Sequence, residues 1–167
     1  ATLTFMVGGP EKDFLRARPI LEAMGQLIVS AGPSGAGQAA KICNNMIAGI
    51  TALACSEAFV LGETLGVDRK TLYDEISTSS GNSAVLNMMC PVSGVTDNAP
   101  ANNEYKPGFA AGLMLKDLRL AQAAALSAGT STPLGAVAAA AFAIHDANGH
   151  SHLDTSSIIK LIKPDIE

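Results

Sequence analysis

The sequence has no tryptophan, few aromatic residues (4%) and few charged ones (16%), whereas 48% of its 167 residues are hydrophobic. This composition excludes an intrinsically disordered chain, which would be rich in charge and poor in hydrophobic side chains. A basic excess is also lacking, because the formal net charge is −4. We therefore expect no nucleic-acid-binding surface and no surface that binds anionic membranes.

Cysteine is scarce, and Cys43, Cys55 and Cys90 form no C-x-x-C pair. An odd number of scattered cysteines indicates buried thiols in a reducing compartment. Long apolar runs are absent, since the longest, residues 134–144 with one glycine, is shorter than the about 18 residues of a membrane-spanning helix. The N-terminus has no signal-peptide pattern. These absences predict a cytoplasmic protein, or one of the mitochondrial matrix if its source is eukaryotic.

The first part of the chain has the pattern of a β-α-β unit. Residues 2–7 and 26–30 are rich in strand-forming side chains, and residues 11–25 between them predict a helix that Pro19 kinks or divides. Two strands and one helix do not make an independently stable sheet. We therefore interpret residues 1–31 as the end of a larger α/β domain whose remainder lies outside this sequence.

Residues 32–167 predict a domain made only of helices. The helices are expected over 38–65, 69–78, 83–89, 110–128, 133–149 and 155–162, with Asp68 capping the second and Thr132 the fifth. The fifth helix is apolar on nearly every side, which predicts burial within the domain or against a partner subunit. Residues 90–108 show no periodicity, and a structureless segment of that length is usually functional or mobile.

A glycine cluster precedes the first of these helices. The stretch GPSGAGQAAKICNN, residues 32–45, contains GAGQAA, which satisfies the dinucleotide-binding pattern G-x-G-x-x-G/A. That pattern needs a second parallel strand after its helix and an acidic residue about 20 positions further on. Here the helix continues, and Glu57 lies in its middle. The cluster is therefore not interpreted as the loop that holds a dinucleotide pyrophosphate.

The helix after the cluster carries a polar pair on a narrow face. Lys41 and Asn45 are four residues apart, so their side chains stack on one side of the helix. The same face continues with small residues, namely Ala48, Gly49, Ala52 and Ser56. One cation, one amide and a row of small residues fit the wall of a cleft that a ligand approaches. A solvated lysine in a first helical turn, with Asn44 and Asn45 in local turn chemistry, explains the same pattern.

Four stretches of the sequence resemble one family. The segment GPSGAGQAAKICNNM resembles the substrate and catalytic segment of 3-hydroxyisobutyrate dehydrogenases, within the β-hydroxyacid dehydrogenase family. TLTFMVGG, SSGNSAVLNMMCPVSGVTDNAPANNEY and GFAAGLMLKDLRLAQ resemble further parts of that family, so the similarity covers almost the whole chain. The resemblance implies a mainly α fold. It would be a helical C-terminal domain of the 6-phosphogluconate-dehydrogenase-like type, preceded by a β-α-β remnant of a Rossmann-type, dinucleotide-binding domain.

The resemblance also implies roles for single residues. Lys41 matches the family's catalytic lysine, the acid/base that acts on the substrate hydroxyl group during hydride transfer. Asn45 matches the amide that hydrogen-bonds the substrate, and Lys116 matches a lysine that reaches the cofactor. Phe109 and Asp117 flank Lys116 in the sequence and are further cofactor-binding candidates.

The same resemblance gives the glycine cluster and the whole protein a function. Gly35 and Gly37 would let the substrate approach the backbone closely. The implied reaction is the NAD(P)-dependent oxidation of 3-hydroxyisobutyrate to methylmalonate semialdehyde in valine catabolism. The absent N-terminal domain would bind most of the NAD or NADP, so we expect this chain alone to be inactive. Enzymes of this family associate through the helical domain, which implies a homodimer or homotetramer.

Alternatives to this function remain open. The substrate could be another small β-hydroxyacid, as in tartronate semialdehyde reduction or L-serine oxidation, and the sequence does not choose between NAD and NADP. A non-catalytic helical dimerisation module would also explain the alanine-rich helices. His145, His150 and His152 lack a third ligand of suitable type and spacing, so we expect no metal site and place these side chains at a helix end and the following loop.

Overall fold

The computed structural model describes residues 3–166, and Thr2 of the first predicted strand lies outside this range. The chain divides into two compact units, one up to Asn44 and the other from Asn45 onward. The long helix α2, Ala36–Thr64, belongs to both. The two units are described separately below.

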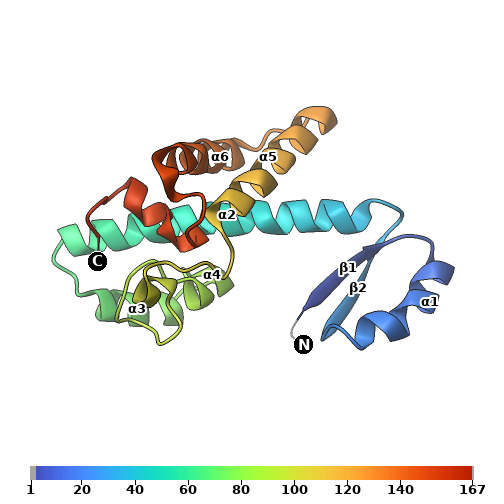
Figure 1. Ribbon diagram of the computed structural model, residues 1–167, viewed down its shortest axis with the longest axis horizontal. Helices are drawn as coiled ribbons and strands as arrows, with labels where there is room; N and C mark the ends of the chain where they lie inside the picture. Colours follow the sequence, from blue (N-terminus) through green and yellow to red (C-terminus); the bar gives the residue numbers. More distant parts are fainter. Residues whose placement is uncertain (1–2, 167) are drawn as a thin grey trace. The chain divides into compact units, whose positions relative to one another are not determined.

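The first unit is a β-α-β arrangement (Figure 1). Strands β1, Thr4–Gly8, and β2, Leu27–Gly32, pair in parallel, and helix α1, Glu11–Glu22, connects them. Pro19 does not divide α1, although division is one of the two effects that the sequence predicts for it. Because it lies in the last turn, its missing N–H and its ring affect only the end of the helix.

Helix α2 is an exception to the expectation that no segment is long and apolar enough to span a membrane. By length and composition, it is the one helix in the described part of the chain that could cross a membrane. Helix α2 contains no long uninterrupted apolar run, because polar residues are scattered along it. One such helix is weak evidence, since the core helices of soluble proteins pass the same test, and the α2 residues Ala52 and Phe59 are indeed buried in cores of the second unit.

The second unit is helical, as the sequence predicts. After α2 follow α3 (Arg69–Thr78), α4 (Ala84–Met88), η1 (Pro100–Asn103), α5 (Ala111–Ala128), α6 (Pro133–His145), η2 (Asp146–His150) and η3 (Thr155–Leu161). Asp68 caps α3 as expected, because its carboxylate accepts a hydrogen bond from the backbone N–H of Thr71. Helices α5 and α6 pack against each other, and η3 packs against both.

The ends of the last helices differ from the prediction. Helix α6 stops at His145, and the chain continues to His150 as a wider π-type turn in which Gly149 has a φ of 87°. Thr132 does not cap α6 with its side chain, because its hydroxyl group donates to the Gln122 side-chain oxygen. The last predicted helix, η3, is a 3₁₀ helix.

The irregular segment 90–108 is part of the core, so it is not structureless, contrary to the sequence-based expectation. It contributes Cys90, Val92, Val95, Ala99 and Tyr105 to a buried hydrophobic cluster that also contains residues of α2, α4 and η3. The Tyr105 hydroxyl group donates to the Pro91 carbonyl oxygen at 2.8 Å. Aperiodic side chains fill this core because the backbone turns repeatedly, and a search for helical or strand periods does not detect such packing.

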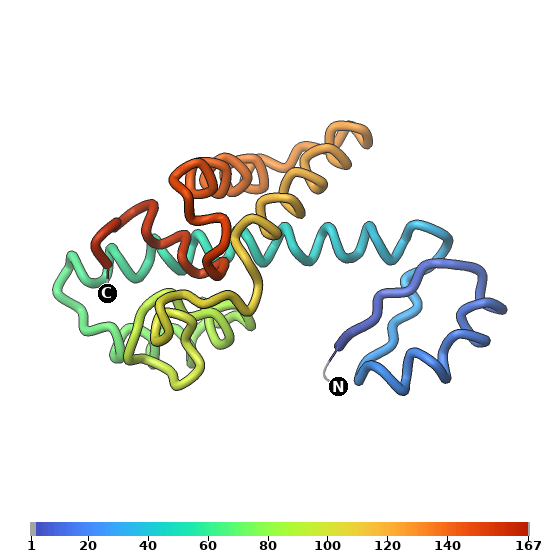
Figure 2. Tube along the Cα trace, viewed as in Figure 1, coloured from blue at the N-terminus to red at the C-terminus, as the bar shows by residue number. Residues whose placement is uncertain are grey.

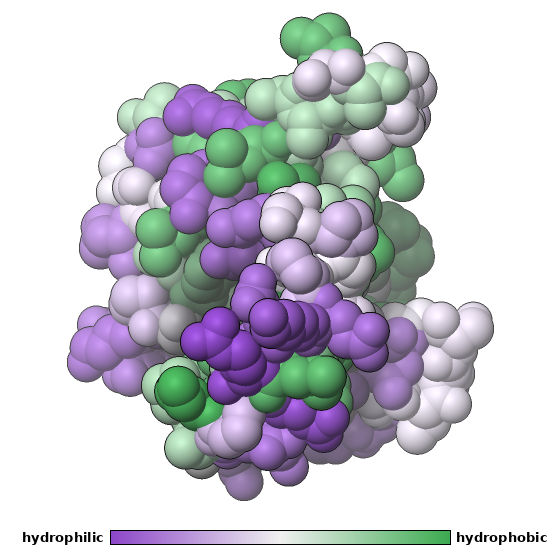
Figure 3. Space-filling model, turned by 90° about the vertical axis from the view of Figure 1, so that its right-hand side faces the viewer, coloured by the Kyte–Doolittle hydropathy of each residue, from purple (hydrophilic) through white to green (hydrophobic). Residues whose placement is uncertain are grey.

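Several apolar or cysteine side chains are more exposed than the sequence predicts. Helix α6 buries Gly135, Ala138, Phe142 and His145 but leaves Leu134, Val137 and Ile144 exposed, so the expected burial on every side does not occur within this chain. Cys43 is exposed and Cys55 half-buried, and only Cys90 is buried. Figure 3 shows one face of the molecule on which apolar residues lie exposed beside polar ones.

Candidate functional site

The glycines at the start of α2 are explained by backbone geometry within the first unit. Gly35 has a φ of 93°, which favours glycine, and no atom lies where its side chain would be. A Cβ atom on Gly37 would lie 2.2 Å from the Met6 carbonyl oxygen. Gly37 therefore allows the first turn of α2 to pack directly on β1. The substrate role of Gly35 and Gly37 stays a prediction.

The small residues on α2 make room for α5. A Cβ atom on Gly49 would lie 3.0 Å from a Leu118 methyl carbon, Ala52 is buried, and the buried Ser56 hydroxyl group donates to the Ala52 carbonyl oxygen. Beyond Asn45 this face is thus a helix–helix contact, and the interpretation as a ligand-lined cleft wall is wrong there. Small side chains allow two helix backbones to approach closely. A row of small residues on one helix face therefore occurs at a helix–helix contact as well as along a cleft.

Three predicted site residues are joined in the second unit. The Asn45 side-chain amide nitrogen donates to Asp117 Oδ2 at 2.6 Å, and Lys116 Nζ lies 3.0 Å from Asp117 Oδ1. Asp117 is only 5% exposed, whereas the Lys116 side chain is 57% exposed. The sequence separates Asn45 from this pair by 72 positions, and the packing of α5 on α2 brings them together.

The cluster has a defined hydrogen-bonding direction. An ionised carboxylate only accepts hydrogen bonds, so the Asn45 amide must turn its nitrogen toward Asp117. Its oxygen then faces away from Asp117 and is oriented by that bond. Burial of a carboxylate is costly unless hydrogen bonds or a paired cation replace its lost hydration, and here Asn45 and Lys116 supply both. Lys41, in the first unit, is exposed one helical turn before Asn45 on α2.

Phe109 lies at the entrance to α5, on the N-terminal side of Lys116 and Asp117. Its side chain packs against the core formed by α2, α5 and α6. Its backbone N–H donates to Asp154 Oδ2 at 3.1 Å, and its carbonyl oxygen accepts from the Thr155 N–H at 2.8 Å. Sequence reasoning did not single out Asp154. The available signal was an aspartate directly before a predicted helix, the usual position of an N-cap residue.

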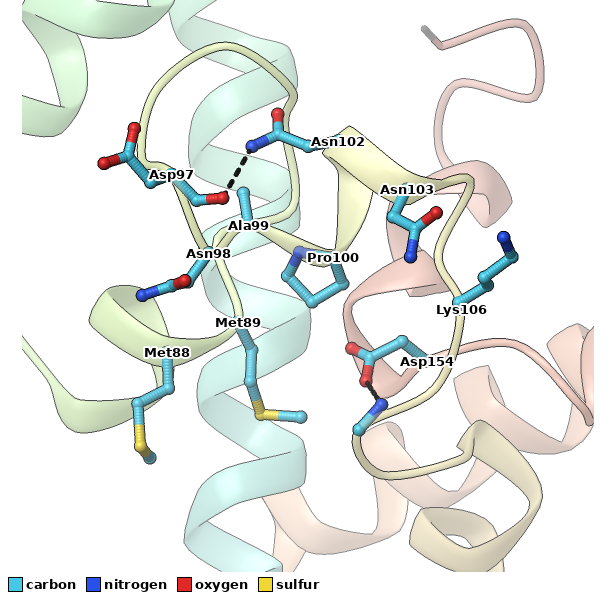
Figure 4. A pocket seen from close by; sticks show the side chains of 11 residues that line it. Met88, Met89, Asp97, Asn98, Ala99, Pro100, Asn102, Asn103, Lys106 and Asp154 are labelled. Atoms are coloured by element: carbon cyan, nitrogen blue, oxygen red, sulfur yellow. Dashed lines mark hydrogen bonds between the residues drawn. The ribbon is translucent and has the colours of Figure 1, made fainter.

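A cavity of about 530 Å³ lies beside this entrance and contains none of the predicted site residues (Figure 4). Its lining combines thioether, amide and carboxyl groups from α4, the irregular segment and the start of η3: Met88, Met89, Asp97, Asn98, Ala99, Pro100, Asn102, Asn103, Lys106, Gly108 and Asp154.

The histidines near the C-terminus lie at the end of α6 and in the segment that follows, as the sequence predicts, but they differ in exposure: His152 is exposed, whereas the His145 ring is not. That ring is fully buried, its Nε2 lies 2.8 Å from the Ser157 hydroxyl oxygen, and its centroid is 4.7 Å from that of His150. Burial, with a smaller effect of His150, lowers the pKa of His145 from 6.5 to about 4. No group of three or more metal-ligating side chains occurs among residues 3–166.

Comparisons with known proteins agree with this architecture. Residues 35–162 match the family model described as "NAD-binding of NADP-dependent 3-hydroxyisobutyrate dehydrogenase", and residues 1–32 match that of the NAD-binding domain of 6-phosphogluconate dehydrogenase. These matches define the class as dehydrogenases that use a nicotinamide dinucleotide. The chain belongs to the 3-hydroxyisobutyrate dehydrogenase family. The predicted fold class is confirmed.

Individual relatives cover nearly all of this chain. The 3-hydroxyisobutyrate dehydrogenase of Pseudomonas aeruginosa is 50% identical over 97% of this chain and 55% of its own length. The NAD-dependent L-serine dehydrogenase of the same organism is 44% identical over 98% of this chain and 55% of its own. A structure of Mycobacterium tuberculosis 3-hydroxyisobutyrate dehydrogenase with L-serine has a TM-score of 0.94 at 46% identity, covering 97% of this chain and 55% of that one. The chain thus spans about half the length of the curated relatives it matches.

Proposed function

We propose that the full-length protein is an NAD(P)-dependent dehydrogenase that oxidises 3-hydroxyisobutyrate to methylmalonate semialdehyde in valine breakdown. The observation that carries the proposal is the cluster in which the buried Asp117 binds both the Asn45 amide and the Lys116 ammonium group. Packing of two helices joins side chains to which the family resemblance gives substrate and cofactor roles. A non-catalytic assembly module would not need this arrangement. We place the protein in the cytoplasm, or in the mitochondrial matrix of a eukaryote.

Lys41 is proposed as the acid/base. Oxidation of an alcohol breaks its O–H bond and the C–H bond on the same carbon, and a C=O bond forms. Lys41 Nζ, in its neutral form, receives the hydroxyl proton, and it returns the proton in the reverse reaction. The chemistry that NAD(P)⁺ would supply, when bound, is a nicotinamide ring as acceptor for the hydride that leaves the carbon. Gly35 and Gly37 would let the substrate approach the backbone at the start of α2.

Asn45 is proposed to hold the substrate beside Lys41. The hydrogen bond to Asp117 holds the Asn45 side chain in one orientation, and an amide can both donate to and accept from the substrate's hydroxyl or carboxylate group. The four-residue spacing places Asn45 on the same side of α2 as Lys41.

The residues around Lys116 fit a dinucleotide. The exposed ammonium group suits the negative charge and polar groups of NAD(P), and Asp117 restrains it. Since the Asp117 carboxylate already binds Asn45 and Lys116, its proposed effect on the cofactor acts through Lys116. We propose Phe109 as an apolar contact to the cofactor, which an N-terminal domain of the full-length protein would bind for the most part.

The substrate and cofactor are tested by reduction of NAD⁺ and NADP⁺ with the full-length protein. We expect the highest kcat/KM with 3-hydroxyisobutyrate. L-Serine is the second candidate, because one relative is named an L-serine dehydrogenase and another was solved with L-serine. Tartronate semialdehyde, assayed in the reducing direction, is the third. Absence of turnover with every small β-hydroxyacid would contradict the proposed function.

The proposed assembly uses the exposed side of α6. Leu134, Val137 and Ile144 are 65%, 59% and 54% exposed, although the helix is otherwise apolar. We propose that this face contacts a second copy in a homodimer or homotetramer. Light scattering on the full-length protein measures the subunit number, and a monomer would contradict this proposal.

Replacing Asp117 with asparagine should lower kcat/KM by about ten- to hundredfold. The variant keeps the size of the side chain, but it offers only one acceptor oxygen where Asn45 and Lys116 both donate. The measurement is steady-state kinetics with the full-length protein. Asp13→Asn, which changes an exposed carboxylate on α1 paired with Arg16, is the matched control. Equal kinetics for the two variants would show that the cluster has no role in turnover.

A further inference from the structure

Helix α5 does not cap its own N-terminus. Ala110, at the cap position, offers no side-chain hydrogen bond. The N–H groups of Ala111 and Gly112 have no acceptor in the preceding turn of the helix. They donate instead to the carbonyl oxygens of Leu153 and Ser151 at 2.7 and 2.9 Å. Figure 2 shows the chain returning to the start of α5 after α6. The segment from 151 onward therefore supplies the cap that helix termini require.

Asp154 fastens this segment to the loop that enters α5. It is 1% exposed, and its Oδ2 accepts hydrogen bonds from the backbone N–H groups of Gly108 at 3.0 Å and Phe109 at 3.1 Å. Its Oδ1 accepts from the N–H and hydroxyl groups of Ser156. Figure 4 shows the carboxylate hydrogen-bonded to the loop at the wall of the cavity. One side chain thus holds two chain segments together.

Thr155 adds a second attachment at the same point. Its N–H and its hydroxyl group both donate to the Phe109 carbonyl oxygen, each at 2.8 Å. Within the described residues Asp154 forms no ion pair, so neutral dipoles alone offset the burial of its charge. Such an arrangement is stable only while every donor keeps its direction, because an incompletely satisfied buried charge is costly. The start of α5 is consequently fixed in one position.

We propose that Asp154 is a positioning residue for the cofactor-binding helix. It fixes Phe109 directly and, through the start of α5, sets the position of Lys116 and Asp117 less than two turns further along the helix. The inference rests on the proposed function, since it concerns how tightly the protein binds NAD(P)H. In this proposal Asp154 acts through these residues and not by binding the cofactor or the substrate.

The test compares Asp154→Asn with the wild type in the full-length protein. Asparagine keeps the acceptor for Ser156 but turns an N–H group toward Gly108 and Phe109, where the wild type has an acceptor. Two quantities are measured: the Kd for NADH and NADPH by fluorescence titration, and hydrogen–deuterium exchange of residues 108–116. We expect faster exchange in this range and an about tenfold higher Kd.

The controls separate positioning from loss of stability. Asp68→Asn makes the same chemical change at the cap of α3, where the carboxylate accepts from the Thr71 N–H, and should leave the Kd unchanged. Thr155→Val removes only one hydrogen bond to Phe109 and should change the Kd in the same direction by a smaller factor. It serves in place of Asp154→Asn if that variant does not fold.

Each result decides one question. Faster exchange at 108–116 with an unchanged Kd would overturn the inference and leave Asp154 a purely structural residue. Unchanged exchange would overturn it as well. A wild-type protein that binds neither dinucleotide would contradict the proposed function instead, and exchange at 108–116 would still decide whether Asp154 holds α5 in place.

Discussion

Replacement of Lys41 with alanine is expected to lower kcat of the full-length protein by about 10²- to 10⁴-fold. The variant removes the amine proposed to receive the hydroxyl proton, while α2 keeps a good helix former at an exposed position. Substrate and cofactor would still bind through other groups, so KM should change much less than kcat. Steady-state kinetics provide the measurement. Both reaction directions are assayed, because Lys41 Nζ is proposed as the base in the oxidation and as the acid in the reduction.

Two further variants define what Lys41 contributes. Arginine at position 41 keeps the positive charge but does not lose its proton, so Lys41→Arg should be nearly as inactive as Lys41→Ala if proton transfer is the function. Lys12→Ala removes an exposed lysine of α1 and should have no effect. A Lys41→Ala variant with wild-type kcat would refute the acid/base assignment and favour the helical dimerisation module.

Between pH 7 and pH 4, His145 alone is expected to cost the folded protein about 3 kcal/mol of stability. In the native state, burial and the neighbouring His150 lower the pKa of His145 from 6.5 to about 4. The unfolded chain therefore binds more protons than the folded one as the pH falls below about 6.5. This contribution is fully present above that pH and is lost progressively as the pH falls toward 4.

Urea unfolding at pH 7.0, 5.5 and 4.5 measures this effect in the full-length protein. His145→Gln can keep a hydrogen bond to Ser157 but does not titrate, so its stability should fall less than that of the wild type as the pH decreases. The exposed His152 lies in the same segment, and His152→Gln is the control with an expected wild-type profile. Identical pH profiles for wild type and His145→Gln would show that the buried ring does not govern acid sensitivity.

The fold was predictable where periodicity or capping determines it. The parallel β-α-β unit follows from two apolar strands around a helix, and α3 begins where Asp68 can cap it. The core role of residues 90–108 was not predictable, because an irregular backbone places its side chains inward without a repeating pattern. The exposed side of α6 was misjudged for a related reason: composition alone does not tell which side of an apolar helix is covered.

The candidate site was predictable in composition but not in arrangement. The lysine and amide on α2 could be read from their spacing, whereas the bond between Asn45 and Asp117 depends on the packing of two helices. The small residues that suggested a cleft make room for α5 instead, as Gly49 shows. The N-cap position of Asp154 could be read locally, but its bonds to Gly108 and Phe109 could not, since these residues lie 46 and 45 positions earlier in the chain.

The cap of α5, which Ser151 and Leu153 supply, has a consequence for how the protein folds during synthesis. During synthesis, α5 leaves the ribosome well before residues 151–155, so the helix that carries Lys116 lacks these hydrogen-bond acceptors for its first N–H groups until that segment emerges. Contacts between residues so far apart form late, because closing the intervening loop costs entropy before the contact stabilises it. Folding of this unit should therefore finish only after residues 151–155 have left the ribosome. A nascent chain that stops before residue 151 would present an unfinished α5 to chaperones and proteases.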